Sequence, residues 1–322
     1  MTPVVGQEIM MSDSTAIISF VDKIIIKANV DTQTDRYKVK TEDETDFQLS
    51  ANNRYRLFLS LDYEFIGFSI GISPKLLPGN GDDNLRGESS FTDVAFRFFL
   101  KSWTQELKYK QVAGYYVENT GAYIPGWQEG TDPYLQFNDL KTTFVGGSTS
   151  YVLNPEFSLR NVVYNTEWQR KSAGSFIPTL RYGISRIEAT LEDGASSEDS
   201  YDIQFSPDYY YTFVLHENWF VAPFISPGVG VRFSTERQEG TGVIAKNTYW
   251  PLSLDGGLQV GYSSERIIFG VVANFETSWY REDERTNIEN DQFFAKLYFG
   301  YRFEAPKIVK KPFNWLNQQL GL

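Results

Sequence analysis

His216 is the single histidine of this chain, and the sequence contains no cysteine. An imidazole beside a serine or a carboxylate is the usual general base of lipases, deacylases and proteases. His216, however, lies in LHENW (215–219), a short turn between two strand-like segments, where a side chain is usually solvated. The lack of cysteine also removes thiolate metal sites, disulfides and cysteine nucleophiles. We therefore expect no catalytic residue, no metal site and no cofactor.

A second group of candidate residues carries charge in the middle of stretches that alternate between apolar and polar side chains. The leucines between residues 55 and 63 alternate with Arg56 and Asp62, and the aromatic face of QFFAKLYFGYRF (292–303) is opposed by Arg302. We expect such charges to face an enclosed lumen and to pair there, because an unpaired buried charge is costly. The charged residues assigned to the lumen are Arg54, Arg56, Asp62, Asp93, Arg97, Lys101, Lys108, Lys110, Arg181, Arg232, Asp255, Glu276, Lys296 and Arg302.

Alternation is the main periodic signal of the sequence and predicts an all-β protein. Strands of about ten residues, joined by alternately short and long connections, are typical of a transmembrane antiparallel up-and-down β-barrel. Lipid offers no water to backbone groups, so a spanning sheet has to close on itself. Aromatic residues near strand ends, such as Trp103, Trp219 and Trp279, suit the two membrane interfaces. The last strand ends at Phe303 and resembles the C-terminal signal that the outer-membrane assembly machinery reads, so we expect a bacterial outer-membrane location.

The strand count contains a conflict. Twelve or thirteen segments qualify, whereas a barrel with both chain ends on the same side requires an even number. Two short connections follow one another between residues 154 and 189. Either SLRNVVYNTEW (158–168) does not span the wall, or one long connection lies on the periplasmic side. We choose twelve strands, and a soluble β-sandwich, which shows the same alternation, stays as the alternative fold.

The chain is acidic, with 30 Lys and Arg against 41 Asp and Glu and a net charge of −11. Nucleic-acid binding usually requires the opposite balance, so we expect no nucleic-acid partner. Acidic residues concentrate at 41–46, 192–202 and 281–285, which we interpret as solvated loops. No run of 18 apolar residues exists, which excludes a transmembrane helix. The first residues do not resemble a signal peptide, and we expect the leader to be absent from this chain.

Three strings carry a family resemblance: WQRKSAGSF (168–176), YYYTFVLHENWFVAPFISPGVGV (209–231) and LYFGYRFEAP (297–306). Together they resemble an uncharacterised family, a domain of unknown function, of Bacteroidota outer-membrane β-barrel proteins with a KSAGSF core. The resemblance covers the chain from about residue 22 to residue 306. It implies an outer-membrane location and a barrel fold, and it assigns no catalytic residue.

The KSAGSF segment, Lys171 to Phe176, has two interpretations. Its lysine and small residues could cradle an anion with accessible backbone amides. The interpretation that we favour is a tight turn in which small residues permit close packing.

The residues after Phe303, EAPKIVKKPFNWLNQQLGL (304–322), form a tail beyond the barrel. Its apolar residues suit one face of a helical turn. We expect the tail either to plug or strap the rim of the barrel, or to dock a periplasmic or membrane partner with its lysines beside lipid headgroups. The residues assigned to docking are Phe313, Trp315, Leu316 and Leu320.

The chain divides into an N-terminal segment (1–20), an outer-membrane β-barrel (21–303) and a C-terminal periplasmic tail (304–322). The favoured function is a non-enzymatic accessory or scaffold subunit of an envelope complex. It would act through its loops and tail, with outer-membrane lipid and a protein of the outer membrane or periplasm as partners. A narrow, weakly anion-preferring solute channel is the alternative, because basic residues outnumber acidic ones in the predicted lumen. A lipid-modifying barrel enzyme is the third hypothesis, and a filled lumen is favoured over an open one.

Overall fold

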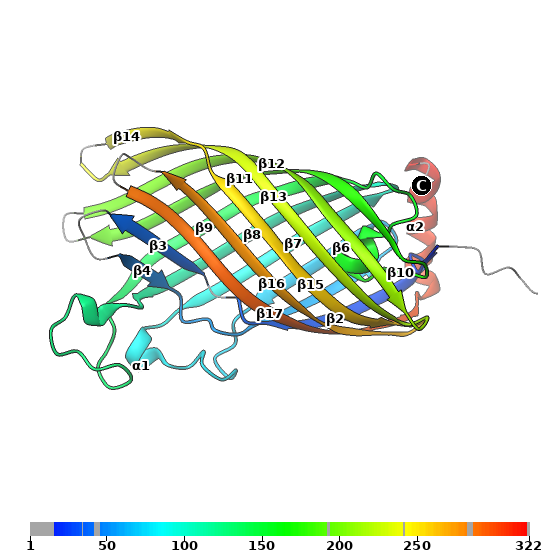
Figure 1. The fold of residues 1–322 in the computed structure, drawn as a ribbon, viewed down its shortest axis with the longest axis horizontal. Coiled ribbons are helices and arrows are strands. Elements are labelled where there is room, and N and C mark those ends of the chain that lie inside the picture. Colours follow the sequence, from blue (N-terminus) through cyan, green and yellow to red (C-terminus); the bar gives the residue numbers. More distant parts are fainter. Residues whose placement is uncertain are drawn as a thin grey trace, which may run out of the picture.

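The computed structural model describes residues 16–33, 35–41, 46–191, 194–240, 242–281 and 286–320. Within them, twelve antiparallel strands close into a barrel (Figure 1), which confirms the predicted fold class and strand number. Consecutive strands pair around the wall, and the last strand pairs with the first. In order, the strands are β2 (Lys23–Asp31), β5 (Arg56–Tyr63), β6 (Ile66–Ile72), β7 (Ser90–Leu100), β8 (Trp103–Val117), β9 (Gln136–Tyr151), β11 (Ala173–Leu191), β12 (Gly194–Leu215), β13 (Trp219–Gln238), β15 (Leu252–Ser263), β16 (Ile267–Arg281) and β17 (Thr286–Glu304).

The connections distinguish the two ends of the barrel. At the short-turn end, only residues 64–65 join β5 to β6 and only residues 216–218 join β12 to β13. The opposite, long-loop end carries the connections 73–89, with helix α1 (Asp83–Arg86), and 118–135, with the 3-10 turn η1 (Thr120–Ala122). Of the three predicted acidic loops, residues 42–45 of the run 41–46, residues 192–193 of the run 192–202 and residues 282–285 of the run 281–285 lie outside the described residues.

The alternation in the sequence corresponds to the two faces of the wall. On β17, Leu297 and Phe299 are exposed on the outer surface, while Tyr298 and Arg302 are buried on the inside. Successive side chains of a strand point to opposite faces, so one strand can meet an apolar medium outside and polar groups inside. The predicted inward and outward faces are therefore correct for this strand.

Exposed tryptophans mark two levels of the outer surface. Trp103 and Trp219 begin β8 and β13 at the short-turn end, and Trp103 contacts the ring of Tyr151 with centroids 4.7 Å apart. Trp250 and Trp279 lie toward the other end, where Trp279 is paired with Leu252 in the sheet. Two aromatic levels with an apolar band between them are the expected exterior of a membrane barrel.

Several strands continue beyond the apolar band at the long-loop end. The acidic run 192–202 is predicted to be a solvated loop, but residues 194–202 belong to β12, so this prediction is wrong for the described part of the run. The ends of β11, β12 and β13 continue at this end of the barrel together with β14 (Gly242–Tyr249), which pairs with β13. On the outer face of this extension, Lys141 of β9 contacts Glu188 of β11 at 2.7 Å. The change from apolar to charged residues thus marks where the outer surface becomes polar, while the strands themselves continue past this point.

The wall narrows toward the long-loop end. Near the short turns, β2, β5, β6 and β7 lie between β17 and β8. Farther along, a hairpin of β3 (Arg36–Thr41) and β4 (Phe47–Ser50) takes their place, because β3 pairs with β17 and β4 pairs with β8. Between β17 and β8, the wall therefore has two strands at the long-loop end and four strands at the short-turn end.

Buried asparagines satisfy the backbone where the four short strands give way to the hairpin. The side-chain oxygen of Asn80 accepts a hydrogen bond of 2.9 Å from the backbone N–H of Tyr55. Its amide nitrogen donates to the carbonyls of Tyr55, at 2.7 Å, and of Pro74, at 3.0 Å. Asn52 donates in the same way to the carbonyl of Gly87, at 3.0 Å. These amides replace the partners that an unbroken strand ladder would supply, since buried backbone groups need partners.

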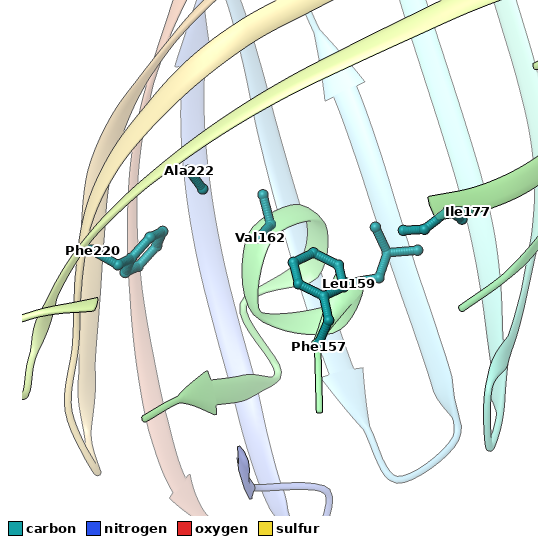
Figure 2. Close-up of a cluster of buried hydrophobic side chains, with 6 residues drawn as sticks. All are labelled: Phe157, Leu159, Val162, Ile177, Phe220 and Ala222. Carbon is teal, nitrogen blue, oxygen red and sulfur yellow. The ribbon is translucent and has the colours of Figure 1, made fainter. Parts of the chain in front are cut away.

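Residues 152–172, between β9 and β11, fold into the short-turn end of the barrel instead of crossing the wall. They contain the short π-helix η2 (Arg160–Tyr164) and strand β10 (Glu167–Gln169), which pairs with β1 (Ile17–Ser19). Figure 2 shows this helical turn surrounded by the strands of the wall. We call residues 152–172 the plug. The plug resolves the strand count, because SLRNVVYNTEW is not a spanning strand and this long connection lies at the short-turn end.

Helix α2 (Lys307–Leu320) follows β17 and lies at the short-turn end, transverse to the barrel (Figure 1). Among the described residues, none of the helices is long and apolar enough to cross a membrane.

Candidate functional site

The plug packs an apolar surface against the inside of the wall. Phe157, Leu159 and Val162 are buried in one cluster with Ile177 of β11 and with Phe220 and Ala222 of β13 (Figure 2). Phe157, Leu159 and Val162 come from the NPEFSLRNVVY stretch (154–164). Burial of several large apolar side chains stabilises a packed segment, so the plug is held by its own small core.

Gln169 fixes the shape of the plug. This buried side chain accepts a hydrogen bond of 2.7 Å from the backbone N–H of Ser158 and donates to the carbonyls of Glu156, at 2.7 Å, and Lys171, at 2.8 Å. Nearby, Asn154 donates to the carbonyl of Gly174 at 2.8 Å. The string that carries the family resemblance, WQRKSAGSF, is therefore the segment that joins the plug to the wall. It forms β10 and the start of β11, and the predicted tight turn within residues 173–176 is strand instead.

Two buried cations connect the wall to the plug. Lys27 of β2 donates hydrogen bonds to the carbonyl of Tyr164, at 3.0 Å, and to the side-chain oxygen of Asn165, at 3.1 Å. Arg302 of β17 donates to the carbonyl of Asn165 at 2.9 Å and lies over the ring of Phe20, 4.3 Å from its centroid. Charged donors make stronger hydrogen bonds than neutral ones, so these contacts fix the plug in the short-turn end.

A second set of charges surrounds the helical turn of the plug. On the inner face of the wall, Arg97 of β7 contacts Asp62 of β5 at 3.2 Å and lies over the ring of Tyr164. Arg160 contacts Glu167 at 3.4 Å. Burial lowers the pKa of Arg160, against the opposing effect of the nearby carboxylates. Burial also raises the pKa of Tyr164, which therefore stays a neutral hydroxyl. The short-turn end is thus filled by packed and paired side chains.

Above the plug, the lumen contains three adjoining cavities of about 430, 490 and 420 Å³. Lys108 borders all three of them, while Arg181 and Glu276 each border two. The cavity next to the plug is bounded by Leu159 and Tyr164 of the plug itself. We call these three cavities together the chamber. The chamber is lined by charged, polar and apolar side chains and is bounded by the plug at the short-turn end.

Most charges of the chamber are paired between neighbouring strands. Such pairing offsets part of the cost of removing the ions from bulk water. The pairs are Lys108 with Asp93 at 3.0 Å, Arg181 with Asp208 at 3.2 Å and Arg232 with Asp202 at 2.5 Å.

Arg56 is the centre of a larger network at the point where the wall narrows. Its guanidinium contacts Asp31 at 2.8 Å and Asp35 at 3.7 Å, and it donates a hydrogen bond to Gln33. Asp35 also pairs with Lys110 of β8. Asp31 and Asp35 flank the connection between β2 and β3, and the network ties them to Arg56 of β5 and Lys110 of β8. We infer that these contacts stabilise the wall where the β3–β4 hairpin replaces four strands.

Asp255 and Glu276 form a cross-strand pair of carboxylates on β15 and β16. Both line the cavity that touches the plug, and Glu276 accepts a hydrogen bond of 2.9 Å from Gln33. A carboxylate pair can perform acid–base chemistry when the proton donor and acceptor are within reach of a substrate. This pair lies inside the lumen, three positions along β15 and β16 from the Leu252–Trp279 pair. Among the described residues, His, Cys, Asp and Glu side chains form no group of three that could hold a metal ion.

The structure places most of the predicted lumen charges inside the barrel but corrects two of them. Arg54 is exposed beside the connection 73–89, and Lys101 is exposed in the turn between β7 and β8, at positive φ. Sequence reasoning missed several inward charges, three of which (Asp31, Asp35 and Asp202) lie at a strand end or in segments interpreted as loops, while Lys27 and Asp208 lie within strands. These residues are Lys27, Asp31, Asp35, Asp202 and Asp208. Four of these five are acidic, so the excess of basic over acidic lumen residues is much smaller than predicted.

The predicted docking residues of the tail have different environments. Phe313 packs on Tyr63 and Phe65, with ring centroids 4.8 and 5.7 Å away. Trp315 is exposed and Leu316 is half-buried. The side chain of Leu320 lies outside the described residues. His216 occupies the short turn between β12 and β13, where the sequence analysis places it, and is exposed.

Comparison with solved structures finds barrels that cover most of the chain at low identity. The outer membrane protease OmpT from Escherichia coli is 10% identical, with 88% of this chain and 98% of that chain covered and a TM-score of 0.41. The β domain of the Bordetella autotransporter BrkA is 11% identical, with coverage of 88% and 100% and a TM-score of 0.37. An outer membrane channel from Pseudomonas putida F1 is 10% identical, with coverage of 88% and 96% and a TM-score of 0.36.

No curated protein matches the sequence. Residues 11–303 match the family described as Domain of unknown function (DUF4421). The match covers the plug and every barrel strand except the last residue of β17. The chain therefore belongs to the DUF4421 family.

Proposed function

We propose that this protein is an outer-membrane β-barrel of a bacterium, from the Bacteroidota by its sequence resemblance, with a lumen that does not conduct. In this proposal it serves as a non-enzymatic accessory or scaffold subunit of an envelope complex. The observation that carries the proposal is the plug. A barrel that transports solute needs a path along its axis, whereas here Lys27, Arg302 and a buried apolar cluster fix residues 152–172 in one end.

The orientation follows from the lengths of the connections. In barrels of this class the short turns are periplasmic and the long loops are extracellular. The plug and α2 then lie on the periplasmic side, and the connections 73–89 and 118–135 lie on the outer side.

The long connections supply an ordered surface for a partner. Trp127 packs against Tyr134 with centroids 4.8 Å apart, and the guanidinium of Arg86 lies 5.4 Å from the ring centroid of Tyr134. Lys75 joins the helix α1 to its loop through Asp83 at 2.7 Å. A preorganised surface binds a partner with less loss of conformational entropy than a flexible loop. These contacts support recognition through the loops.

The first test separates a closed barrel from a channel. The purified protein is inserted into planar lipid bilayers, and we expect no stable conductance. A variant in which residues 155–170 are replaced by a short Gly-Ser linker should conduct, with heat-modifiable gel mobility as the control for a folded barrel. Steady conductance of the unaltered protein would overturn the proposal and favour the channel.

The second test addresses the scaffold role. The tagged protein is purified from native membranes in mild detergent, beside a variant with Leu76, Tyr123 and Ile124 replaced by Ser. These three side chains are exposed on the long loops. We expect proteins that co-purify in stoichiometric amounts with the unaltered chain and are lost from the variant. A chain that is purified alone from native membranes would contradict the scaffold role.

The enzyme hypothesis has weaker support. Asp255 and Glu276 form the carboxylate pair that such chemistry needs, but they lie inside the lumen, where both border the cavity that touches the plug. Retention of the lipid A pattern in cells that lack the protein is the result expected from a non-enzymatic role.

A further inference from the structure

Some side chains on the outer face of the barrel are buried where exposed residues are expected. On β2, Ile26 is 47% exposed, but Ile24, two residues away on the same face, is 8% exposed. On β5, Leu61 is 46% exposed, but Tyr63 on the same face is 5% exposed. Residues two apart in a strand share a face. The outer wall is therefore covered at the short-turn end of these two strands.

Helix α2 is what covers them. Ile24, Tyr63 and Ala305 form a buried cluster against which Val309 and Phe313 of the helix pack. The contact between Phe313 and Tyr63, with centroids 4.8 Å apart, is edge to face. Because Ile24 and Tyr63 belong to the outer face, α2 lies against the outside of the wall and does not enter the lumen. Figure 1 shows the helix transverse to the barrel at this end.

The remaining surface of α2 has one apolar and one polar side. Successive residues of an α-helix are separated by about 100°. Ile308 and Trp315, seven residues apart, therefore lie on one side, about 120° from the side that packs on the barrel. Ile308 is 82% exposed and Trp315 is 60% exposed. Asn314 is exposed on the other side, together with the lysines at 307 and 311, while Lys310 reaches back to Glu304 at 3.4 Å.

We propose that α2 is an interfacial helix that lies in the lipid leaflet at the short-turn end, with Ile308 and Trp315 in the lipid and its lysines at anionic headgroups. Three observations support lipid as the occupant. The helix packs on the outer wall, and Phe299 and Tyr301 of the adjoining β17 are exposed on that same face. Its exposed apolar residues, Ile308 and Trp315, form one side of the helix. Tryptophan at the level of the headgroups and lysine beside them are the side chains that suit this boundary.

The absence of cysteine from the sequence permits a direct test. Single-cysteine variants Ile308→Cys, Trp315→Cys and Asn314→Cys are labelled with the fluorophore NBD. They are reconstituted in nanodiscs of phosphatidylethanolamine and phosphatidylglycerol, in which both faces are accessible. Asn314 is the matched control, because it adjoins Trp315 in sequence and points to the polar side.

We expect the labels at 308 and 315 to be quenched by nitroxide-labelled lipids and protected from iodide, and the label at 314 to show the opposite behaviour. Iodide quenching at 308 and 315 equal to that at 314 would overturn the proposal and would identify this side as a surface for a protein. A folded barrel is verified for each variant by heat-modifiable mobility. The result does not depend on whether the protein is a scaffold, because no partner is present in the nanodisc.

A second variant tests the lysines. Replacement of Lys307, Lys310 and Lys311 by Gln should shift the label at 315 toward the aqueous quencher in phosphatidylglycerol discs and leave it unchanged in discs of neutral lipid. An equal response in both lipids would contradict the headgroup contact.

Discussion

Lys27 of the wall donates a hydrogen bond of 3.1 Å to the side chain of Asn165 in the plug, although the two residues are 138 positions apart in the chain. The first and the middle parts of the sequence thus meet at one buried ammonium group. We expect Lys27→Met to leave the carbonyl of Tyr164 and the amide of Asn165 without their donor, which costs about 1–3 kcal/mol per unsatisfied group. The midpoint of urea unfolding in lipid vesicles should fall, and brief conductance steps should appear in planar bilayers. Lys246→Met, at an exposed position of β14, is the control, and equal midpoints for the two variants would contradict the role of Lys27.

Substitution of Arg302 is a stricter test of the contact between the wall and the plug, because the guanidinium donates hydrogen bonds to several acceptors at once. It donates to the carbonyl of Asn165 and to the hydroxyl of Ser263, at 2.9 and 3.2 Å. A lysine carries the same charge but cannot reproduce the planar fork. We expect Arg302→Lys to destabilise the barrel by roughly 1.5–3 kcal/mol, the range for a hydrogen bond to a charged group. The measurement is urea unfolding followed by gel mobility. Full stability of the lysine variant would mean that charge alone is needed.

Asn80 is expected to hold the connection 73–89 against the start of β5, without affecting the stability of the whole barrel. Asn80→Ala removes three hydrogen bonds to the backbone of Tyr55 and Pro74. The connection 73–89 should become sensitive to limited proteolysis while the barrel retains its heat-modifiable mobility. Asn138→Ala, at an exposed position, serves as the comparison. Cleavage at the same rate in both variants would show that Asn80 does not hold the loop.

Arg56 should be the most costly of the lumen charges to remove. Arg56→Met leaves Asp31 and Asp35 buried with fewer cationic partners. Removal of one partner from a buried charge network typically costs about 3–5 kcal/mol. We expect a large loss of folded protein in refolding experiments, which the double variant Arg56→Met with Asp31→Asn partly restores. If the second substitution instead lowers the yield further, the two residues are not coupled as described.

The barrel, its strand number and most of the inward charges can be predicted from the sequence, because a wall between lipid and lumen requires apolar and polar residues to alternate. Alternation assigns Arg54 and Lys101 to the lumen wrongly, because the pattern continues past the ends of the strands. Asp202 is missed because the acidic run 192–202 resembles a loop, although Tyr201 and Ile203 beside Asp202 keep an exposed apolar face. The plug was missed as a structure for a different reason. Its apolar residues, such as Phe157 and Val162, face the inside of the barrel, and no periodicity in a short segment distinguishes this from a spanning strand. Only the requirement for an even strand number draws attention to this segment, and it leaves open whether residues 158–168 do not span the wall or one long connection lies on the periplasmic side.

The last strand, β17, closes the barrel by pairing with two separate strands, β2 and β3. This division has a consequence for the order in which the barrel closes. The last strand pairs with β2 over residues 296–304 and with β3 over residues 286–289. Between the two stretches, Thr32 forms the contact to Ala295 where the chain leaves β2. The chain ends can therefore be joined in two separate steps, the first at the short-turn end and the second beside the narrowing. The upper stretch is the shorter ladder, so its amide hydrogens should exchange with solvent without opening the lower one. In a barrel built in this way, the short ladder at the long-loop end can open while the longer ladder at the short-turn end remains closed.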